Sequence, residues 1–179
     1  GPRGAGHPRA DRSGAGALMT LAARAAAPMS SAAPVADRGA TGSSAHQRLM
    51  LRLFHRSVLK QAKWRQIAAL LGPTDDLRCL DIGADNGVLS YLLRQQGGRW
   101  VSADLEPEMV AAIREVVGEG VGLLPPAAWP FAAGAFDRVV VADGLEHVHD
   151  DCAFVRELAR VTEAGGAIVL NVPLRRASW

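Results

Sequence analysis

The chain has 179 residues, of which 49% are hydrophobic, enough for one ordinary domain and an extension but not for two full domains. Its two cysteines suggest no disulfide framework, and it contains no run of about 18 apolar residues that could cross a membrane. The net charge of +2 conceals three unequal parts: residues 1–45 carry +3, residues 46–71 carry +6 without any acidic residue, and residues 72–179 carry −7.

The first 45 residues are dominated by Gly, Ala, Ser, Pro and Arg and include no aromatic side chain. Such a segment cannot bury enough apolar surface to offset the entropy lost on ordering, so we expect residues 1–45 to be disordered. Its Arg-rich, acid-poor composition superficially matches a transit peptide. We favour the alternative of non-native sequence read upstream of a start at Met19, Met29 or Met50.

Residues 46–72 are expected to form a basic helical segment of one or two helices, which Gly72 and Pro73 end. Four cations recur every four residues and so form one stripe with Lys63 beside it: Arg48, Arg52, Arg56 and Lys60. The opposite side is apolar, with Met50, Leu51, Phe54 and Val58. The favoured interpretation is a helix that packs its apolar side on the domain. The alternative is contact with an anionic surface, either a membrane or a charged substrate.

Residues 73–179 alternate between strand and helix patterns. Strands are predicted at residues 80–82, 100–104, 121–124, 136–142 and 167–172, and helices at residues 88–96, at residues 107–117 and after Asp150 or Asp151. Gly165 and Gly166 are predicted to form the turn before the last strand. This order favours an α/β fold with a parallel sheet and right-handed crossovers.

The first strand leads through a glycine turn into a helix, in the sequence C-L-D-I-G-A-D-N-G-V-L-S-Y of residues 79–91. Such a junction aims backbone N–H groups into a crevice, and Gly83 and Gly87 would let the backbone approach a ligand. Asp81 can accept hydrogen bonds within the turn. Asp104, at the end of the second strand, could bind both ribose hydroxyls of an adenosine. On these residues alone, an ordinary strand-to-helix turn and a helix-capping Asp104 remain alternatives.

Residues 80–87 resemble motif I, D-x-G-x-G-x-G, of class I S-adenosylmethionine-dependent methyltransferases. Residues 129–151, W-P-F-A-A-G-A-F-D-R-V-V-V-A-D-G-L-E-H-V-H-D-D, and residues 156–173 resemble the type 11 group, which contains several quinone-biosynthesis enzymes. The resemblance covers roughly residues 78–173 and implies the class I methyltransferase fold, a Rossmann-like parallel sheet flanked by helices. The chain departs from the family pattern at Asp85, where a glycine is usual, and at Pro125, where an acid is common.

The resemblance implies S-adenosylmethionine as the cofactor and methyl transfer to a small-molecule or lipid acceptor such as a quinone precursor. It implies these cofactor-binding residues: Asp81, Gly83, Ala84, Asp85, Gly87, Asp104, Leu105 and Gly144. His147 would be the base if one is needed, or else a histidine at the rim bonded to a backbone carbonyl. We expect no metal at the Glu146–Asp151 cluster, no nucleic-acid partner, and a cytoplasmic location with peripheral membrane contact as a further hypothesis.

Two other functions stay open at this point. A catalytically silent methyltransferase-like binding module would be compatible with Asp85 and Pro125, whereas a nicotinamide oxidoreductase conflicts with the glycine spacing after Gly83. Class I methyltransferase sheets normally have seven strands, and only five are predicted here. We therefore expect residues 73–179 to be a domain truncated after the fifth strand, with an open edge at residues 167–172 that favours aggregation, and a fragment that could lack activity.

Overall fold

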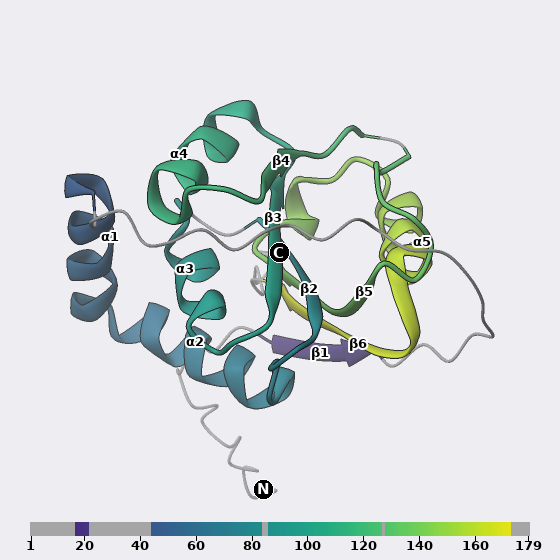
Figure 1. Cartoon of the computed structure of the whole chain (residues 1–179), viewed down its shortest axis with the longest axis horizontal. Coiled ribbons are helices and arrows are strands. Elements are labelled where there is room, and N and C mark those ends of the chain that lie inside the picture. Colours follow the sequence, from purple (N-terminus) through teal and green to yellow (C-terminus); the bar gives the residue numbers. More distant parts are fainter. Residues whose placement is uncertain (1–16, 22–43, 84–85, 127, 173–179) are drawn as a thin grey trace, which may run out of the picture.

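The computed structural model describes residues 17–21, 44–83, 86–126 and 128–172. Its centre is a six-stranded sheet in the order β1-β6-β5-β2-β3-β4 (Figure 1). The strands are β1 (Ala17–Leu21), β2 (Arg78–Ile82), β3 (Arg99–Asp104), β4 (Val121–Leu123), β5 (Phe136–Ala142) and β6 (Thr162–Val172). The strands β2 to β6 are parallel and β1 is antiparallel. The predicted α/β class and its parallel sheet are confirmed.

Helices cover both faces of the sheet (Figure 1). They are α1 (Ala45–Arg56), α2 (Val58–Leu71), α3 (Val88–Arg94), α4 (Pro107–Val117) and α5 (Asp151–Val161), with a 3-10 turn η1 (Leu145–His147). Val140 of β5 packs in one core cluster with residues of α2 and α3, while Val139 and Val141 pack in another with residues of α5. This explains the unbroken apolar run in β5, because both of its faces are covered.

Among the described helices, none combines the length and apolar character needed to cross a bilayer.

The basic segment consists of two helices that break at Ser57. The Ser57 N–H donates to the Phe54 carbonyl at 3.0 Å, and the Ser57 hydroxyl accepts from the Lys60 N–H at 3.2 Å as the N-cap of α2. The predicted single stripe is therefore wrong, since Lys60 belongs to a different helix from Arg48, Arg52 and Arg56. Val58 was expected on the packed side, but it follows the break and is 73% exposed.

The strand β1 lies where no regular structure was predicted. Most of residues 1–45 lie outside the described part, but Ala17–Leu21 pairs along β6, with Ala17 opposite Val172 and Leu21 opposite Ile168. The edge of β6 that was expected to be open therefore carries a strand. The physical reason is that the free N–H and C=O groups of an edge strand recruit any nearby extended chain, whatever its local composition.

The strand β6 begins five residues earlier than predicted, at Thr162. Thr162 lies opposite Phe136, and Ala167 lies opposite Arg138. The four residues 163–166 of β6 are therefore opposite one residue of β5, Asp137. Gly165 has a φ of +81°, and a Cβ on Gly166 would come within 2.9 Å of the Asp137 carbonyl oxygen. The glycine pair therefore makes an irregularity inside the strand and not a turn before it.

The loop before β5 is fastened to α5. The Trp129 N–H donates to Glu157 Oε2 at 2.9 Å, and the Arg160 guanidinium donates to the carbonyl oxygens of Phe131 and Trp129 at 2.7 and 3.1 Å. Arg160 also pairs with Glu157 at 2.7 Å, which lowers the pKa of that carboxyl. In this segment, residues that carry the family resemblance hold the fold together.

Asp137 of β5 supports a first prediction. Its carboxylate accepts from the Arg78 backbone N–H at 2.8 Å and from the guanidinium at 3.1 and 2.8 Å, and these contacts lower the pKa of Asp137. Stability from a lowered carboxyl pKa is present above the unfolded value and lost as the pH falls through the folded one. Asp137→Asn should therefore reduce the free energy of unfolding by about 1–2 kcal/mol at pH 7 in urea titrations.

The difference between Asp137→Asn and the parent should shrink as the pH falls below about 4, first because the unfolded chain takes up the proton and then because the folded carboxylate, with its lowered pKa, does so as well. Glu119→Gln is the matched control, since Glu119 is an exposed carboxylate in a loop and its loss should change little. An equal loss of stability for Asp137→Asn at both pH values would contradict the ion-pair account.

Candidate functional site

The carboxyl ends of β2 and β5 form a crevice by topology. From β2 the chain proceeds to β3 and β4 on one side, then returns to β5 and β6 on the other side of β2. Connections that leave neighbouring parallel strands in opposite directions open a crevice at their carboxyl ends, where α/β proteins bind ligands. Gly83 follows β2, Asp104 ends β3, and Asp143 and Gly144 follow β5, so all four lie at this edge.

Gly83 brings the turns after β2 and β5 into contact. Its φ is +73°, and its N–H donates to the Ala103 carbonyl at 3.2 Å. A Cβ at this position would lie 2.7 Å from the Ala142 carbonyl oxygen and 3.2 Å from Gly144 Cα. The turn therefore requires glycine for both its backbone angle and its close packing. The predicted site residues Ala84 and Asp85 lie outside the described residues.

Gly87 packs closely against a neighbouring helix. Its φ is +83°, but a Cβ would lie 2.9 Å from both Ile113 Cα and Val116 Cβ of α4. The missing side chain thus makes room for α4, which requires glycine here whether or not a ligand approaches. The sequence indicated that a Cβ had to be absent here, but it did not indicate which neighbour required its absence.

Asp81 is buried beneath the turn. Its carboxylate accepts hydrogen bonds from the hydroxyls of Ser90 in α3, at 2.6 Å, and of Ser102 in β3, at 2.8 Å. Arg94 Nη1 lies 3.7 Å from Asp81 Oδ2 and also donates to the Ser102 hydroxyl oxygen at 2.7 Å. Burial raises the pKa of Asp81, and Arg94 and the two serines oppose this shift. We therefore assign Asp81 a positioning role under the turn.

The partners of Asp81 were not found from the sequence. Ser90 and Ser102 are fully buried, each in an element whose other buried positions are mostly apolar. A serine at a position predicted to be buried could have indicated such a partner, because a buried hydroxyl needs a hydrogen-bond partner. Burial lowers the pKa of Arg94, and the Asp81 carboxylate opposes that shift.

Asp104 is placed as predicted, at the end of β3, and is 9% exposed. Its Oδ1 atom accepts from the Glu106 N–H at 3.0 Å. Burial raises the pKa of Asp104, while the backbone N–H groups of Glu106 and Leu105 and the charge of His147 oppose the rise. Leu105 beside it is half-buried against the core cluster on the α5 side.

His147 and Asp104 lie close enough to interact electrostatically, although 43 positions separate them in the chain. His147 is exposed in η1, and its backbone N–H donates to the Gly144 carbonyl at 3.2 Å. The structure therefore gathers Gly83, Asp104, Gly144 and His147 at one edge of the sheet. Within the described residues, no three His, Cys, Asp or Glu side chains are grouped as a metal site would require.

An ion pair missed by sequence reasoning joins α2 to this edge. The Lys63 ammonium pairs with the Asp143 carboxylate directly after β5. Asp143 has a φ of +52°, and its N–H donates to the Asn171 carbonyl at 3.0 Å. Lys63 had been predicted only to lie beside the basic stripe, so the pair adds that α2 belongs to the surroundings of the crevice.

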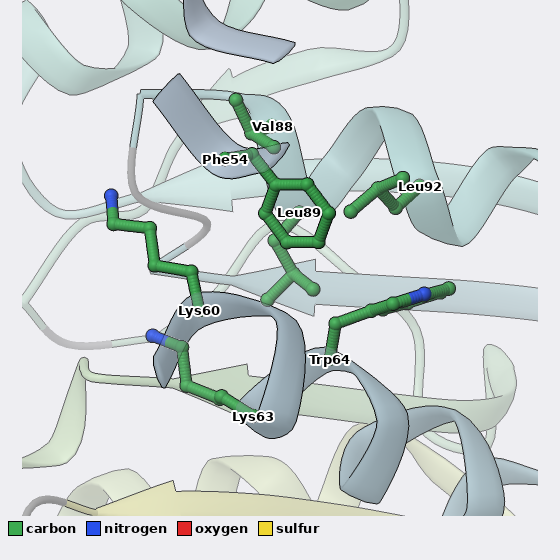
Figure 2. Close-up of a pocket in the computed structure, with 7 residues that line it drawn as sticks. All are labelled: Phe54, Lys60, Lys63, Trp64, Val88, Leu89 and Leu92. Carbon is green, nitrogen blue, oxygen red and sulfur yellow. The ribbon is translucent and has the colours of Figure 1, made fainter. Parts of the chain in front are cut away.

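A shallow hollow lies between α1, α2 and α3 (Figure 2). The space between its lining side chains is about 300 Å³, a volume that includes open solvent. Figure 2 shows two lysine side chains on one side of the hollow and Trp64 on the other. The lining residues are Phe54, Lys60, Lys63, Trp64, Val88, Leu89 and Leu92. Since Val88 directly follows Gly87, the hollow adjoins the helix that leaves the glycine turn.

These residues fit an adenosine-containing cofactor. A carboxylate at a strand end can accept two hydroxyl hydrogens of a ribose, and Oδ1 of Asp104 already has one N–H donor that holds the group in place. The glycine turn at Gly83 and the half-buried Leu105 flank this carboxylate. The fold and the crevice thus define a Rossmann-like α/β domain.

Comparison with known proteins identifies the family. The family described as a methyltransferase domain matches residues 80–170, slightly more than half of the chain. The chain therefore belongs to this family, the class I S-adenosylmethionine-dependent methyltransferases. The resemblance noted from the glycine turn and the segments around residues 129–173 is confirmed.

One similar protein is the demethylmenaquinone methyltransferase of Mycolicibacterium vanbaalenii, 36% identical over 115 residues, which cover 60% of this chain and 47% of that protein. Among solved structures, YcgJ of Bacillus subtilis matches with a TM-score of 0.56 and 24% identity, covering 62% of this chain and 50% of that one. An S-adenosylmethionine-dependent methyltransferase of Mesorhizobium loti matches with a TM-score of 0.55 and 22% identity, covering 62% and 53%. The chain spans about half the length of these proteins.

Gly83 supports a second prediction, with Gly118 as its matched control. Both residues have positive φ, +73° and +80°, but a Cβ on Gly118 would meet nothing within 4 Å. Gly118→Ala should cost about 1 kcal/mol of folding free energy from backbone strain alone. Gly83→Ala should cost about 1–3 kcal/mol more, because its Cβ collides with the turn after β5. Urea denaturation of both variants measures the difference. Equal losses of folding free energy would show that the turns after β2 and β5 are not in contact.

Proposed function

We propose that this protein transfers a methyl group from S-adenosylmethionine to a quinone precursor of the demethylmenaquinone type. The observation that carries the proposal is the Asp104 carboxylate, which lies beside the Gly83 turn and near His147. All three are at the crevice formed by the carboxyl ends of β2 and β5. The name of the similar Mycolicibacterium vanbaalenii protein supports the choice of acceptor. The proposed location is the cytoplasm.

Asp104 would accept the two ribose hydroxyls, Leu105 would pack on the adenine, and the backbone at Gly83 and Gly144 would contact the amino-acid end. The cofactor, when bound, supplies a methyl group already activated on a sulfonium. The protein therefore needs to contribute alignment and exclusion of water more than covalent chemistry. The buried network under Asp81 supports this alignment, since it holds β2, β3 and α3 in one arrangement.

The acceptor atom loses a proton as it gains the methyl group. His147 is the residue that we assign to take this proton, because it is exposed at the crevice and lies near Asp104. The apolar part of the acceptor is assigned to the hollow between α1, α2 and α3, where Phe54 and Trp64 offer aromatic faces. The Lys63–Asp143 pair links this hollow to the turn after β5.

A second candidate is a methyltransferase-like module that binds the cofactor without turnover. Pro125 favours it, because it is exposed just after β4 and has no side-chain acceptor for the adenine amino group. The two candidates differ in one measurement. Cofactor binding without methyl transfer to any quinone precursor would favour the silent module.

Asp104→Ala is the third prediction and tests the cofactor site. Loss of two charge-assisted hydrogen bonds should weaken S-adenosylhomocysteine binding by about 2–4 kcal/mol, roughly 30- to 1,000-fold, in calorimetry. Because burial raises the pKa of Asp104, the affinity of the parent should begin to fall at a higher pH than an ordinary carboxylate would give. Glu108→Ala, an exposed acid four residues later, is the control and should bind like the parent. Parent-like affinity of Asp104→Ala would overturn the site.

The fourth prediction concerns the acceptor. Trp64→Ala should raise the KM for a short-chain demethylmenaquinone about tenfold, because it removes one wall of the hollow, while S-adenosylhomocysteine affinity stays the same. The control is Leu70→Ala, because Leu70 is an exposed side chain on α2. Trp100→Ala would be unsuitable, because Trp100 lies in the core. If Trp64→Ala changes cofactor affinity and leaves the KM unaltered, the hollow is not the acceptor site.

A further inference from the structure

Exposed apolar side chains are concentrated on α1 and α2. Of the six large hydrophobic side chains that are exposed in the described residues, five lie on these two helices: Leu49 (48%), Leu53 (49%), Val58 (73%), Leu59 (73%) and Leu70 (43%). The sixth, Leu123, lies on β4. Single exposed leucines are ordinary, but five on one helix pair mark a surface that contacts something.

The same two helices carry the highest positive charge of the chain. Residues 44–71 include six Lys or Arg and no acidic residue. On α1, Arg52 and Arg56 are exposed and adjoin Leu49 and Leu53 on the outer side by helical spacing. Apolar and cationic side chains therefore share one face of α1, and the exposed Val58 and Leu59 follow it at the start of α2. We name these residues together the α1–α2 outer surface: Leu49, Arg52, Leu53, Arg56, Val58 and Leu59.

Contacts on the inner side fix the direction in which this surface faces. Phe54 is buried against the domain, and the Ser44 hydroxyl and the Gln47 side-chain amide donate to the carbonyls of Glu115 and Val116 at the end of α4, at 3.2 and 3.1 Å. The helix α1 is thus anchored at its first turn and along its inner side. Figure 1 shows α1 as the outermost helix of the molecule, joined at one end to α2.

We propose that the α1–α2 outer surface docks on the face of an anionic lipid bilayer. Leucine and valine side chains can enter the boundary between headgroups and acyl chains, while arginines reach the lipid phosphates along apolar stems. Charge complementarity selects this occupant. A symmetric contact with a second copy would oppose two surfaces that both carry cations and no acid, which is unfavourable.

This inference goes beyond the proposed function and does not depend on it. Its test measures attachment to vesicles and not methyl transfer, so a wrong acceptor would leave the result unchanged. Likewise, a failure to bind vesicles would leave the cofactor site at Asp104 untouched.

The experiment is co-sedimentation of the 179-residue chain with vesicles of phosphatidylcholine alone or with phosphatidylglycerol added. Binding is expected only to the anionic vesicles, and it should fall steeply between low and physiological salt because the Debye length shortens. Arg52→Glu/Arg56→Glu should weaken binding at least about tenfold, since each basic residue near an anionic surface contributes roughly a fivefold factor. Val58→Ser/Leu59→Ser should weaken it by about fivefold or more through lost apolar burial.

Two control variants match these changes elsewhere on the molecule. Arg99→Glu/Arg156→Glu reverses two exposed charges on β3 and α5, and Leu123→Ser removes the exposed leucine of β4. Both should bind like the parent, and circular dichroism checks that every variant is folded. The proposal is overturned if neutral vesicles bind equally well or if the controls lose as much affinity as the surface variants. Dimerisation that depends on Val58 and Leu59, without any vesicle binding, would assign the surface to a second copy instead.

Discussion

A buried carboxylate sets the geometry on which the rest of the domain depends. Asp81 of β2 joins three elements, because its oxygens accept from Ser90 of α3 and Ser102 of β3 while Arg94 lies within ion-pair distance. A buried charge without such partners would be strongly destabilising, so the elements around it have one favourable arrangement. Gly83 begins its turn two residues after Asp81, and Asp104 ends the strand that carries Ser102. The contacts of Asp81 therefore help to position the two candidate site residues Gly83 and Asp104.

Local patterns were sufficient to predict most of the domain. The strand β5 and the helix α4 both have the predicted limits. The signals for them are local, because β5 is an unbroken apolar run and α4 begins with a proline in its first turn. The strand β1 could not be predicted, since its pairing with β6 joins residues more than 140 positions apart. The break at Ser57 depends on one serine that can cap the next helix, a feature too small to stand out in a helical pattern.

In the candidate site, too, local features were predicted from the sequence and contacts between distant residues were not. Gly83, Asp104, Gly144 and His147 were each found from the sequence, but only the fold shows that they meet at one edge. Gly87 shows what a motif leaves open, because the sequence did not show that the absence of a Cβ there also makes room for a neighbouring helix. The ion pair of Lys63 was missed for a related reason. Its partner Asp143 lies 80 positions away, and nothing in the spacing of charges on α2 points to it.

The antiparallel pair of β1 and β6 has a consequence for the order of events during synthesis. Among the described strands the ribosome makes β1 first and β6 last, so about 150 residues must be added between them before the two can pair. At roughly 5–20 residues per second this takes about 8–30 s, during which the parallel strands β2 to β5 can already assemble. The pairing of β1 with β6 therefore cannot form before the other described strands have been made.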